Sequence, residues 1–246
     1  MAVNQGFESV SDCETPHVRR RQQIYVGLAI LAVATLAIPI AFVAMRLSEA
    51  DHLQRLATGR GAVVQWGWRH HDKWFDSMTM RRIGGNAHIG FHENPTTGTP
   101  FTDVEWLALS DELQPLSHRV HGVDFSKSNV GRQSLLDLSR YPGLLTLCLA
   151  STNLTDEGIE VLDDLPQIEF LMVYENNMTD EAMRHIAHLP QLKYLLVDGT
   201  QMTSKAINEL KALTHLEELR IHGTPLDGDA LKSFADENPN IRIIEH

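Results

Sequence analysis

Histidine is the residue type in this chain that most suggests catalysis or metal binding, because 13 of its 246 residues are histidines. One group falls within a short region and consists of His70, His71, Asp72, His88 and His92. His185 and His188 form a second group, on one face of an expected helix. Imidazole and carboxylate groups bind zinc, so the first group suggests a metal site or a hydrolase within residues 60–93 as one alternative. With no H-E-x-x-H motif and no cysteine beside them, solvated surface histidines are favoured, and we expect no metal and no cofactor.

Motifs for nucleophilic catalysis or nucleotide binding do not occur in the sequence. It contains neither G-x-S-x-G nor a glycine-rich phosphate loop. Asp163 and Asp164 are adjacent carboxylates, but adjacent residues of a helix point in different directions, which favours a solvated helix face. The triplets that begin at Asn153 and Asn177 match the glycosylation pattern, yet a repeat explains their spacing. We therefore expect a protein that is not an enzyme.

Apolar residues recur every 24 positions in the C-terminal half of the chain. Four segments of the form L-x-x-L-x-L begin at Leu144, Ile168, Leu192 and Leu216, and a weaker first copy begins at Val120. Apolar and other residues alternate in each segment, as in a short strand that is buried on one face. A period of this kind is typical of repeat architectures, in which each unit packs against the next.

The second half of each unit has the period of a helix. In the first complete unit the apolar residues Ile159, Leu162 and Leu165 lie three positions apart. The residues placed to cap these helices with a hydroxyl group are Thr155, Thr179 and Thr203. Strand, turn and helix in constant order predict an α/β fold with a parallel sheet and one row of helices.

These units resemble the leucine-rich repeat family, in a bacterial subtype whose helices begin T-D-x-G/A-apolar, as at Thr155 and Thr179. The resemblance covers roughly residues 118–246 and implies a solenoid that binds another protein. One departure concerns the asparagine that usually follows the strand, because this position holds Asn176 in one unit and Ser128, Thr152, Thr200 or Thr224 in the others. A hydroxyl group can make part of the hydrogen-bond ladder of an amide, so we expect less rigid turns.

Strand residues that alternate with the leucines face away from the helices. The middle of this face is aromatic and apolar, and charged residues lie toward its C-terminal end, which is typical of a recognition patch. We expect the binding residues to be Phe170, Met172, Tyr174, Tyr194, Leu196, Asp198, Arg220 and His222. The alternatives are an apolar face without function, a face covered by residues 84–100, and self-association of a scaffolding protein through the same surface.

From Ile24 to Met45 there are 22 residues without a charge. As a helix they span about 33 Å at about 1.5 Å per residue, which matches a hydrocarbon core about 30 Å thick. A buried core helix would show a polar stripe, and a cleaved signal peptide has an apolar region of only about 7–15 residues. We therefore expect one uncleaved transmembrane helix at residues 23–46.

The charges beside this helix predict its orientation. Arg19, Arg20 and Arg21 precede it, whereas the cations on its other side are diluted by Glu49 and Asp51. By the positive-inside rule the N-terminus is cytoplasmic and the C-terminal domain is extracytoplasmic. The expected organisation is a disordered tail at 1–22, the helix at 23–46, a juxtamembrane α/β region and linker at 47–100, and a repeat domain with terminal caps at 101–246. Residues 47–93 form either a separate unit or the cap of the array, and their short length favours the cap.

The net charge and the cysteine content limit the classes of partner that the chain can bind. Three acidic residues and three arginines balance in the first 45 residues, so the net charge of −11 belongs to residues 46–246. Such a domain is not expected to bind nucleic acid. With this topology Cys13 and Cys148 lie on opposite sides of the membrane and cannot pair. We expect a protein partner or a second copy of the chain.

Overall fold

The computed structural model describes residues 41, 44–66, 69–70, 73–74, 87–91, 98–224 and 227–245. The chain divides into two compact units, Met1–Arg46 and Leu47–His246. In the first unit the described residues, 41 and 44–46, are helical. The tail at 1–22 and most of the transmembrane helix expected at 23–46 therefore lie outside the described residues. Within the described ranges, no helix is both long and apolar enough to cross a membrane.

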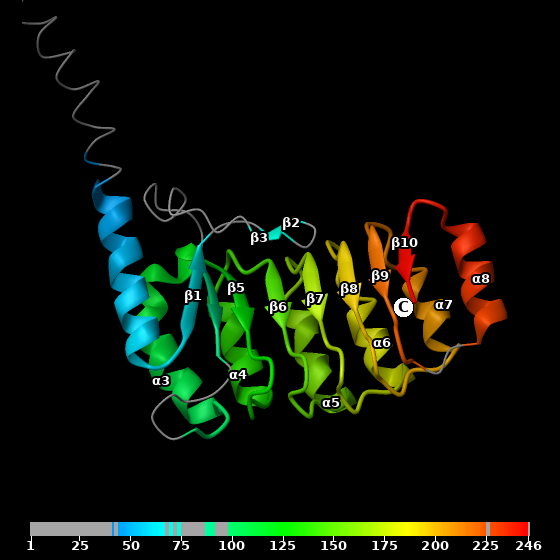
Figure 1. Ribbon diagram of the computed structural model, residues 1–246, viewed down its shortest axis with the longest axis horizontal. Helices are drawn as coiled ribbons and strands as arrows, with labels where there is room; N and C mark the ends of the chain where they lie inside the picture. Colours follow the sequence, from blue (N-terminus) through cyan, green and yellow to red (C-terminus); the bar gives the residue numbers. More distant parts are fainter. Residues whose placement is uncertain are drawn as a thin grey trace, which may run out of the picture. The chain divides into compact units, whose positions relative to one another are not determined.

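The second unit is built on one sheet of eight described strands, in the order β1-β4-β5-β6-β7-β8-β9-β10 (Figure 1). These strands are β1 (Val63–Trp66), β4 (Ala87–Gly90), β5 (Val120–Asp124), β6 (Thr146–Cys148), β7 (Phe170–Met172), β8 (Tyr194–Leu196), β9 (Glu218–Arg220) and β10 (Arg242–Ile244). β1 is antiparallel to β4, and each later pair is parallel. A separate antiparallel pair joins β2 (Arg69–His70) to β3 (Lys73–Trp74).

Figure 1 shows the strands of this sheet in front and the helices behind them. A helix at residues 44–59 precedes the sheet. The later helical elements are α3 (Asp103–Leu113), η1 (Gln114–Arg119), α4 (Arg132–Asp137), η2 (Leu138–Arg140), α5 (Asp156–Ile159), η3 (Glu160–Asp164), α6 (Asp180–Ile186), α7 (Ala206–Leu210) and α8 (Gly228–Glu237). The predicted parallel sheet with one row of helices is confirmed.

The register of the sheet equals the sequence period. Leu147 pairs with Leu171, Leu171 with Leu195, and Leu195 with Leu219, so each step between neighbouring strands is 24 residues. These four leucines are fully buried on the helix side of the sheet and belong to one continuous core. Apolar burial on one face, repeated from strand to strand, is what holds a solenoid together. The fold is therefore leucine-rich-repeat-like.

The turns after the strands are held by one amide and several hydroxyl groups. Asn176 Oδ1 accepts hydrogen bonds from the backbone N–H groups of Thr152 and Leu154, at 3.0 and 3.1 Å. Its Nδ2 donates to the carbonyl of Leu149 at 2.6 Å, so one side chain bridges two repeats. At the matching position Thr200 donates to the carbonyl of Val197 at 2.9 Å. The hydroxyl thus satisfies a carbonyl but no N–H group, as expected for a partial ladder.

The helix starts differ from the prediction. Thr179 Oγ1 accepts the N–H of Glu181 at 3.3 Å and so caps α6. Thr155 precedes α5 without a side-chain capping bond, and α7 begins only at Ala206, three residues after Thr203. Thr203 Oγ1 nevertheless accepts the N–H of Lys205 at 3.4 Å, as Thr179 Oγ1 accepts that of Glu181, so the expected capping hydroxyl is wrong for Thr155.

Carboxylates of the preceding repeat also bind the threonines at two of these helix starts. Asp156 accepts hydrogen bonds from the N–H and the hydroxyl of Thr179, at 2.8 and 2.7 Å. Asp180 accepts the same pair of bonds from Thr203, at 2.6 and 2.7 Å. Each carboxylate satisfies a backbone N–H at the start of the next helical segment, where a negative charge is favourable. The threonine hydroxyls therefore act mainly between repeats.

Both ends of the sheet are closed. At the N-terminal end β1 and β4 extend the sheet beyond β5, and Trp106 of α3 packs its ring against Phe125 with centroids 4.9 Å apart. The fully buried Arg119 is paired with Glu49 at 3.3 Å. The described residues between Leu47 and Phe91 thus belong to the same compact unit as the repeats. At the other end β10 pairs with β9 in parallel and forms the C-terminal cap expected for the array.

Replacement of a core leucine tests the register. Leu171→Ala should lower the free energy of unfolding by about 2–5 kcal/mol, since it leaves a cavity in a closed core. Lys193→Ala is the control, because its partly exposed ion pair with Glu169, 3.0 Å long, contributes about 0–1 kcal/mol. Chemical denaturation of the full chain, followed by circular dichroism, measures both. Equal losses for the two variants would mean that the register is wrong.

Candidate functional site

The expected binding residues lie on the sheet face opposite the helix side. Phe170 pairs in register with Tyr194, Met172 with Leu196, and Leu196 with Arg220. Tyr174, Asp198 and His222 continue the pattern at the ends of the strands, again 24 residues apart. Parallel strands lie about 4.8 Å apart, so equivalent side chains of neighbouring repeats touch. The structure therefore brings the predicted residues onto one face.

This face is less open than the sequence indicated. Met172 is 8% exposed and Leu196 7% exposed, and they form an apolar cluster with Cys148 and Ala150 that is separate from the main core. Asp198 is also buried, at 8% exposed. Met172, Leu196 and Asp198, which are among the expected binding residues, thus have little surface to offer a partner. Met172 and Leu196 cover each other on neighbouring strands. The Asp198 carboxylate accepts hydrogen bonds from Arg220 and from the backbone of His222.

Half-buried aromatic residues surround this cluster. Phe170 and Tyr174 pack against it, and the rings of Phe170 and Tyr194 stack with centroids 5.5 Å apart. The Tyr194 hydroxyl donates to Glu217 Oε2 at 2.9 Å. Burial raises the pKa of Tyr194 to about 12, and the hydrogen bond to the Glu217 carboxylate adds to this effect. Both tyrosines therefore stay neutral, with apolar ring faces and polar tips.

Charged groups border the aromatic residues toward β9. Arg220 forms an ion pair with Asp198, and its guanidinium carbon lies 5.9 Å from the centre of the Tyr174 ring. Asp198 Oδ1 also accepts the backbone N–H of His222 at 2.7 Å. These contacts hold Arg220 in one orientation over the aromatic surface. A surface arginine without such partners would have no fixed orientation.

Cys148 is the one cysteine among the described residues, and it is not placed for nucleophilic chemistry. Its Sγ lies 2.8 Å from Ser126 Oγ, and it is 2% exposed. Burial, with the nearby Asp124 carboxylate, raises the pKa of the thiol to about 12. A thiolate is the reactive form of cysteine, so this group is inert at neutral pH.

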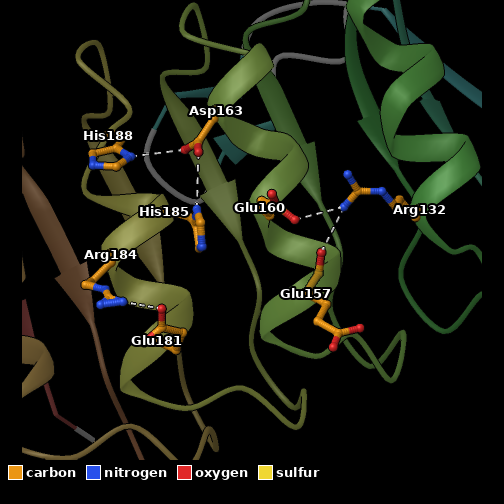
Figure 2. Close-up of polar contacts among 8 residues, drawn as sticks. All are labelled: Arg132, Glu157, Glu160, Asp163, Glu181, Arg184, His185 and His188. Atoms are coloured by element: carbon orange, nitrogen blue, oxygen red, sulfur yellow. Dashed lines mark hydrogen bonds and ion pairs between the residues drawn. The ribbon is translucent and has the colours of Figure 1, made fainter.

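A second group of side chains lies on the helix side, where sequence reasoning expected solvated residues. Figure 2 shows Asp163 of η3 between His185 of α6 and His188, which follows α6. Asp163 Oδ2 lies 3.2 Å from His185 Nδ1, and Asp163 Oδ1 lies 3.2 Å from His188 Nδ1. The 24-residue period indicates this arrangement, because position 163 of one repeat aligns with position 187 of the next, which lies between the two histidines in the sequence. The histidine group expected around residues 60–93 lies mostly outside the described residues.

A groove of about 740 Å³ runs between the starts of α4 and α5. Asp103 Oδ1 on its wall accepts the N–H of Gly131 at 2.8 Å. Arg132 donates to Glu160 Oε2 at 3.2 Å and to the Glu157 carbonyl at 3.3 Å (Figure 2). The charged groups of the groove thus bind one another, and we assign it no ligand.

No protein-family model matches this chain, and no curated protein matches it. Among solved structures, an internalin from Listeria monocytogenes aligns with a TM-score of 0.43 and 19% sequence identity. The alignment covers 54% of this chain and 37% of the internalin chain, so this chain spans about a third of that structure. The repeat assignment rests on the strand register described above.

The burial of Cys148 predicts its reactivity and a pH dependence. In a Cys13→Ser background, iodoacetamide should not modify Cys148 in the native protein at pH 8 and should modify it fully after denaturation. The folded pKa is raised above the ordinary value of 9.0, so the folded state holds the thiol proton more tightly. This contribution to stability is present below about pH 9 and is lost as the pH rises toward 12. Rapid modification of the native protein, measured by mass spectrometry, would contradict the burial.

Proposed function

We propose that Leu47–His246 is a protein-binding module and not an enzyme, and that it binds through the sheet face opposite the helix side. The observation that carries this proposal is the group of half-buried aromatic residues Phe170, Tyr174 and Tyr194 around an apolar cluster. Aromatic residues at the centre of a patch with a polar border are enriched in protein interfaces.

The electrostatics of this face support a protein partner of mixed polarity. Glu217 and Glu218 lie beside Tyr194, whereas Arg220 lies beside Tyr174. Charges of both signs at a rim select a partner by complementarity and contribute more to specificity than to affinity. The net charge of −11 opposes binding to a phosphate backbone.

The aromatic residues provide the test of this proposal. Tyr174→Ala and Tyr194→Ala should each weaken partner binding by more than about 1 kcal/mol, roughly fivefold in Kd, as for central aromatic anchors. The partner is first isolated with the full chain as bait, and its affinity is then measured by surface plasmon resonance. The unfolding midpoint of each variant is measured alongside, because both tyrosines are partly buried.

Substitutions on the helix side are the matched controls. Glu160→Ala and Arg184→Ala remove exposed side chains of η3 and α6, on the other side of the sheet from the aromatic residues, and should leave the affinity unchanged. A double Tyr174→Ala/Tyr194→Ala variant that binds as tightly as the parent would overturn the proposal. If the mass of the parent rises with concentration and that of the double variant does not, the partner is a second copy of the chain.

We propose in addition that residues 23–46 anchor this module in a membrane, with the N-terminus cytoplasmic. The support is the 22-residue uncharged stretch and the three arginines before it. Cys148 cannot report the orientation, because its thiol is buried. The exposed position Lys232 on α8 can report it as Lys232→Cys.

Thiol labelling in cells tests this topology. A membrane-impermeant maleimide should modify Lys232→Cys in intact cells, and it should modify Cys13 only after the membrane is permeabilised. The parent, in which position 232 is a lysine, is the control for background labelling. Modification of Cys13 alone in intact cells would reverse the orientation, and a chain recovered in the soluble fraction would exclude the anchor.

A further inference from the structure

The cluster of Asp163, His185 and His188 lies on the helix side and plays no part in the proposed binding face. Asp163 belongs to one repeat and the two histidines to the next. The potential ligand atoms of the three side chains all lie within 4.8 Å of one another. We propose that this cluster is a binding site for a divalent transition-metal ion of the Zn²⁺ class.

The distances within the cluster fit such an ion. Metal–ligand bonds of about 2.0–2.1 Å in a tetrahedron place neighbouring ligand atoms about 3.3 Å apart. Both Nδ1–carboxylate separations are 3.2 Å. The two imidazole rings are nearly perpendicular, at 87°, with centroids 6.4 Å apart. All ligand atoms lie within 4.8 Å of one another, and the His188 side chain, which is 67% exposed, has the most room to adjust to an ion.

The backbone that carries the ligands is held in place by the core. Leu162 and Ile186, which adjoin Asp163 and His185, are fully buried, and Leu189, which adjoins His188, is 1% exposed. The Leu189 N–H donates to the Ile186 carbonyl at 3.1 Å and closes the turn that carries His188. Rigid supporting elements reduce the entropy that a metal site loses on binding.

The charges around the cluster favour a cation. Within the described part of the chain, the two imidazoles are the partners of the Asp163 carboxylate. The nearby Arg184 is paired with Glu181, and Arg132 with Glu160, so neither guanidinium competes for Asp163 (Figure 2). The domain is acidic, with all of the net charge of −11 after residue 45. A bound divalent ion would reduce this charge.

A metal ion would replace the two hydrogen bonds between the imidazoles and Asp163. In the tautomer with the proton on Nδ1, each imidazole donates to one oxygen of Asp163. An ion that takes the place of these two protons binds both Nδ1 atoms, and each ring then carries its one proton on Nε2. Two imidazoles and one carboxylate select zinc, copper or nickel over magnesium or calcium. Three protein ligands leave a fourth position for water or for a donor group of a partner.

Titration of the full chain with Zn²⁺ alone tests the site. Isothermal titration calorimetry of the parent should show one equivalent that is lost, or weakened at least about tenfold, in Asp163→Asn, His185→Gln and His188→Gln. His215→Gln is the matched control, since His215 is exposed and lies outside the cluster. Because other histidines also bind Zn²⁺, the result is the difference between each variant and the parent.

A second measurement covers the case in which one variant folds poorly. Zn²⁺ should raise the midpoint of thermal unfolding of the parent and of His215→Gln, because an ion that binds the folded state stabilises it. It should raise the midpoint of His188→Gln by less, and this residue is the most exposed of the three. Equal Zn²⁺ stoichiometry, affinity and thermal shift in the parent and the His185→Gln/His188→Gln double variant would overturn the proposal. This result would leave the proposed binding face untouched.

Discussion

The structure depends on one constraint, which is that strands of three residues cannot be stable within a single repeat. In β6, β7 and β8 the backbone bonds of the sheet run to the neighbouring repeats at a constant offset of 24 residues. Each repeat therefore gains its stability from the interface with the next repeat. Asn176 strengthens this dependence, because its one buried amide holds backbone groups of two repeats together. The Asp156 and Asp180 bridges do the same at the helix starts.

Stacking at a fixed offset also explains where the two candidate sites lie. Any residue is neighbour to the residue 24 positions later, so Phe170 stacks on Tyr194 on one face. On the helix side the same offset places Asp163 beside His185 and His188. One face thus gathers aromatic residues suited to a protein partner, and the other gathers ligands suited to a metal ion. Both proposals are consequences of the same repeat geometry.

Much of the fold could be predicted because its signal is periodic. The strand register, the buried leucines and the closing strand β10 all follow from apolar spacing. The pairing of β1 with β4 could not be predicted, because strands from distant parts of a chain carry no shared period. The predicted cap at Thr155 is wrong, and the carboxylate bridges from Asp156 to Thr179 and from Asp180 to Thr203 were not predicted, because they join residues of different repeats.

The candidate sites were predicted less completely. Alternation along a strand indicates which face a side chain takes, but exposure depends on neighbours in three dimensions, and Met172, Leu196 and Asp198 are buried. The pair of adjacent aspartates was correctly placed on an exposed helical face. Its relation to His185 and His188 has no apolar periodicity to reveal it, because these three residues lie on the exposed side of the helical segments. The membrane anchor and its orientation stay predictions, since those residues lie outside the described part of the chain.

Amide hydrogen exchange of the full chain tests the dependence of each repeat on its neighbour most directly. The N–H groups of Leu149, Val173 and Val197 donate to carbonyls of the following repeat, at Met172, Leu196 and Arg220. If stacking supplies the stability, these three amides exchange slowly and with one common free energy of opening. The substitution Asn176→Ala should then lower the protection of Leu149 and Val173 together. Three unrelated opening free energies, each insensitive to this substitution, would contradict the account.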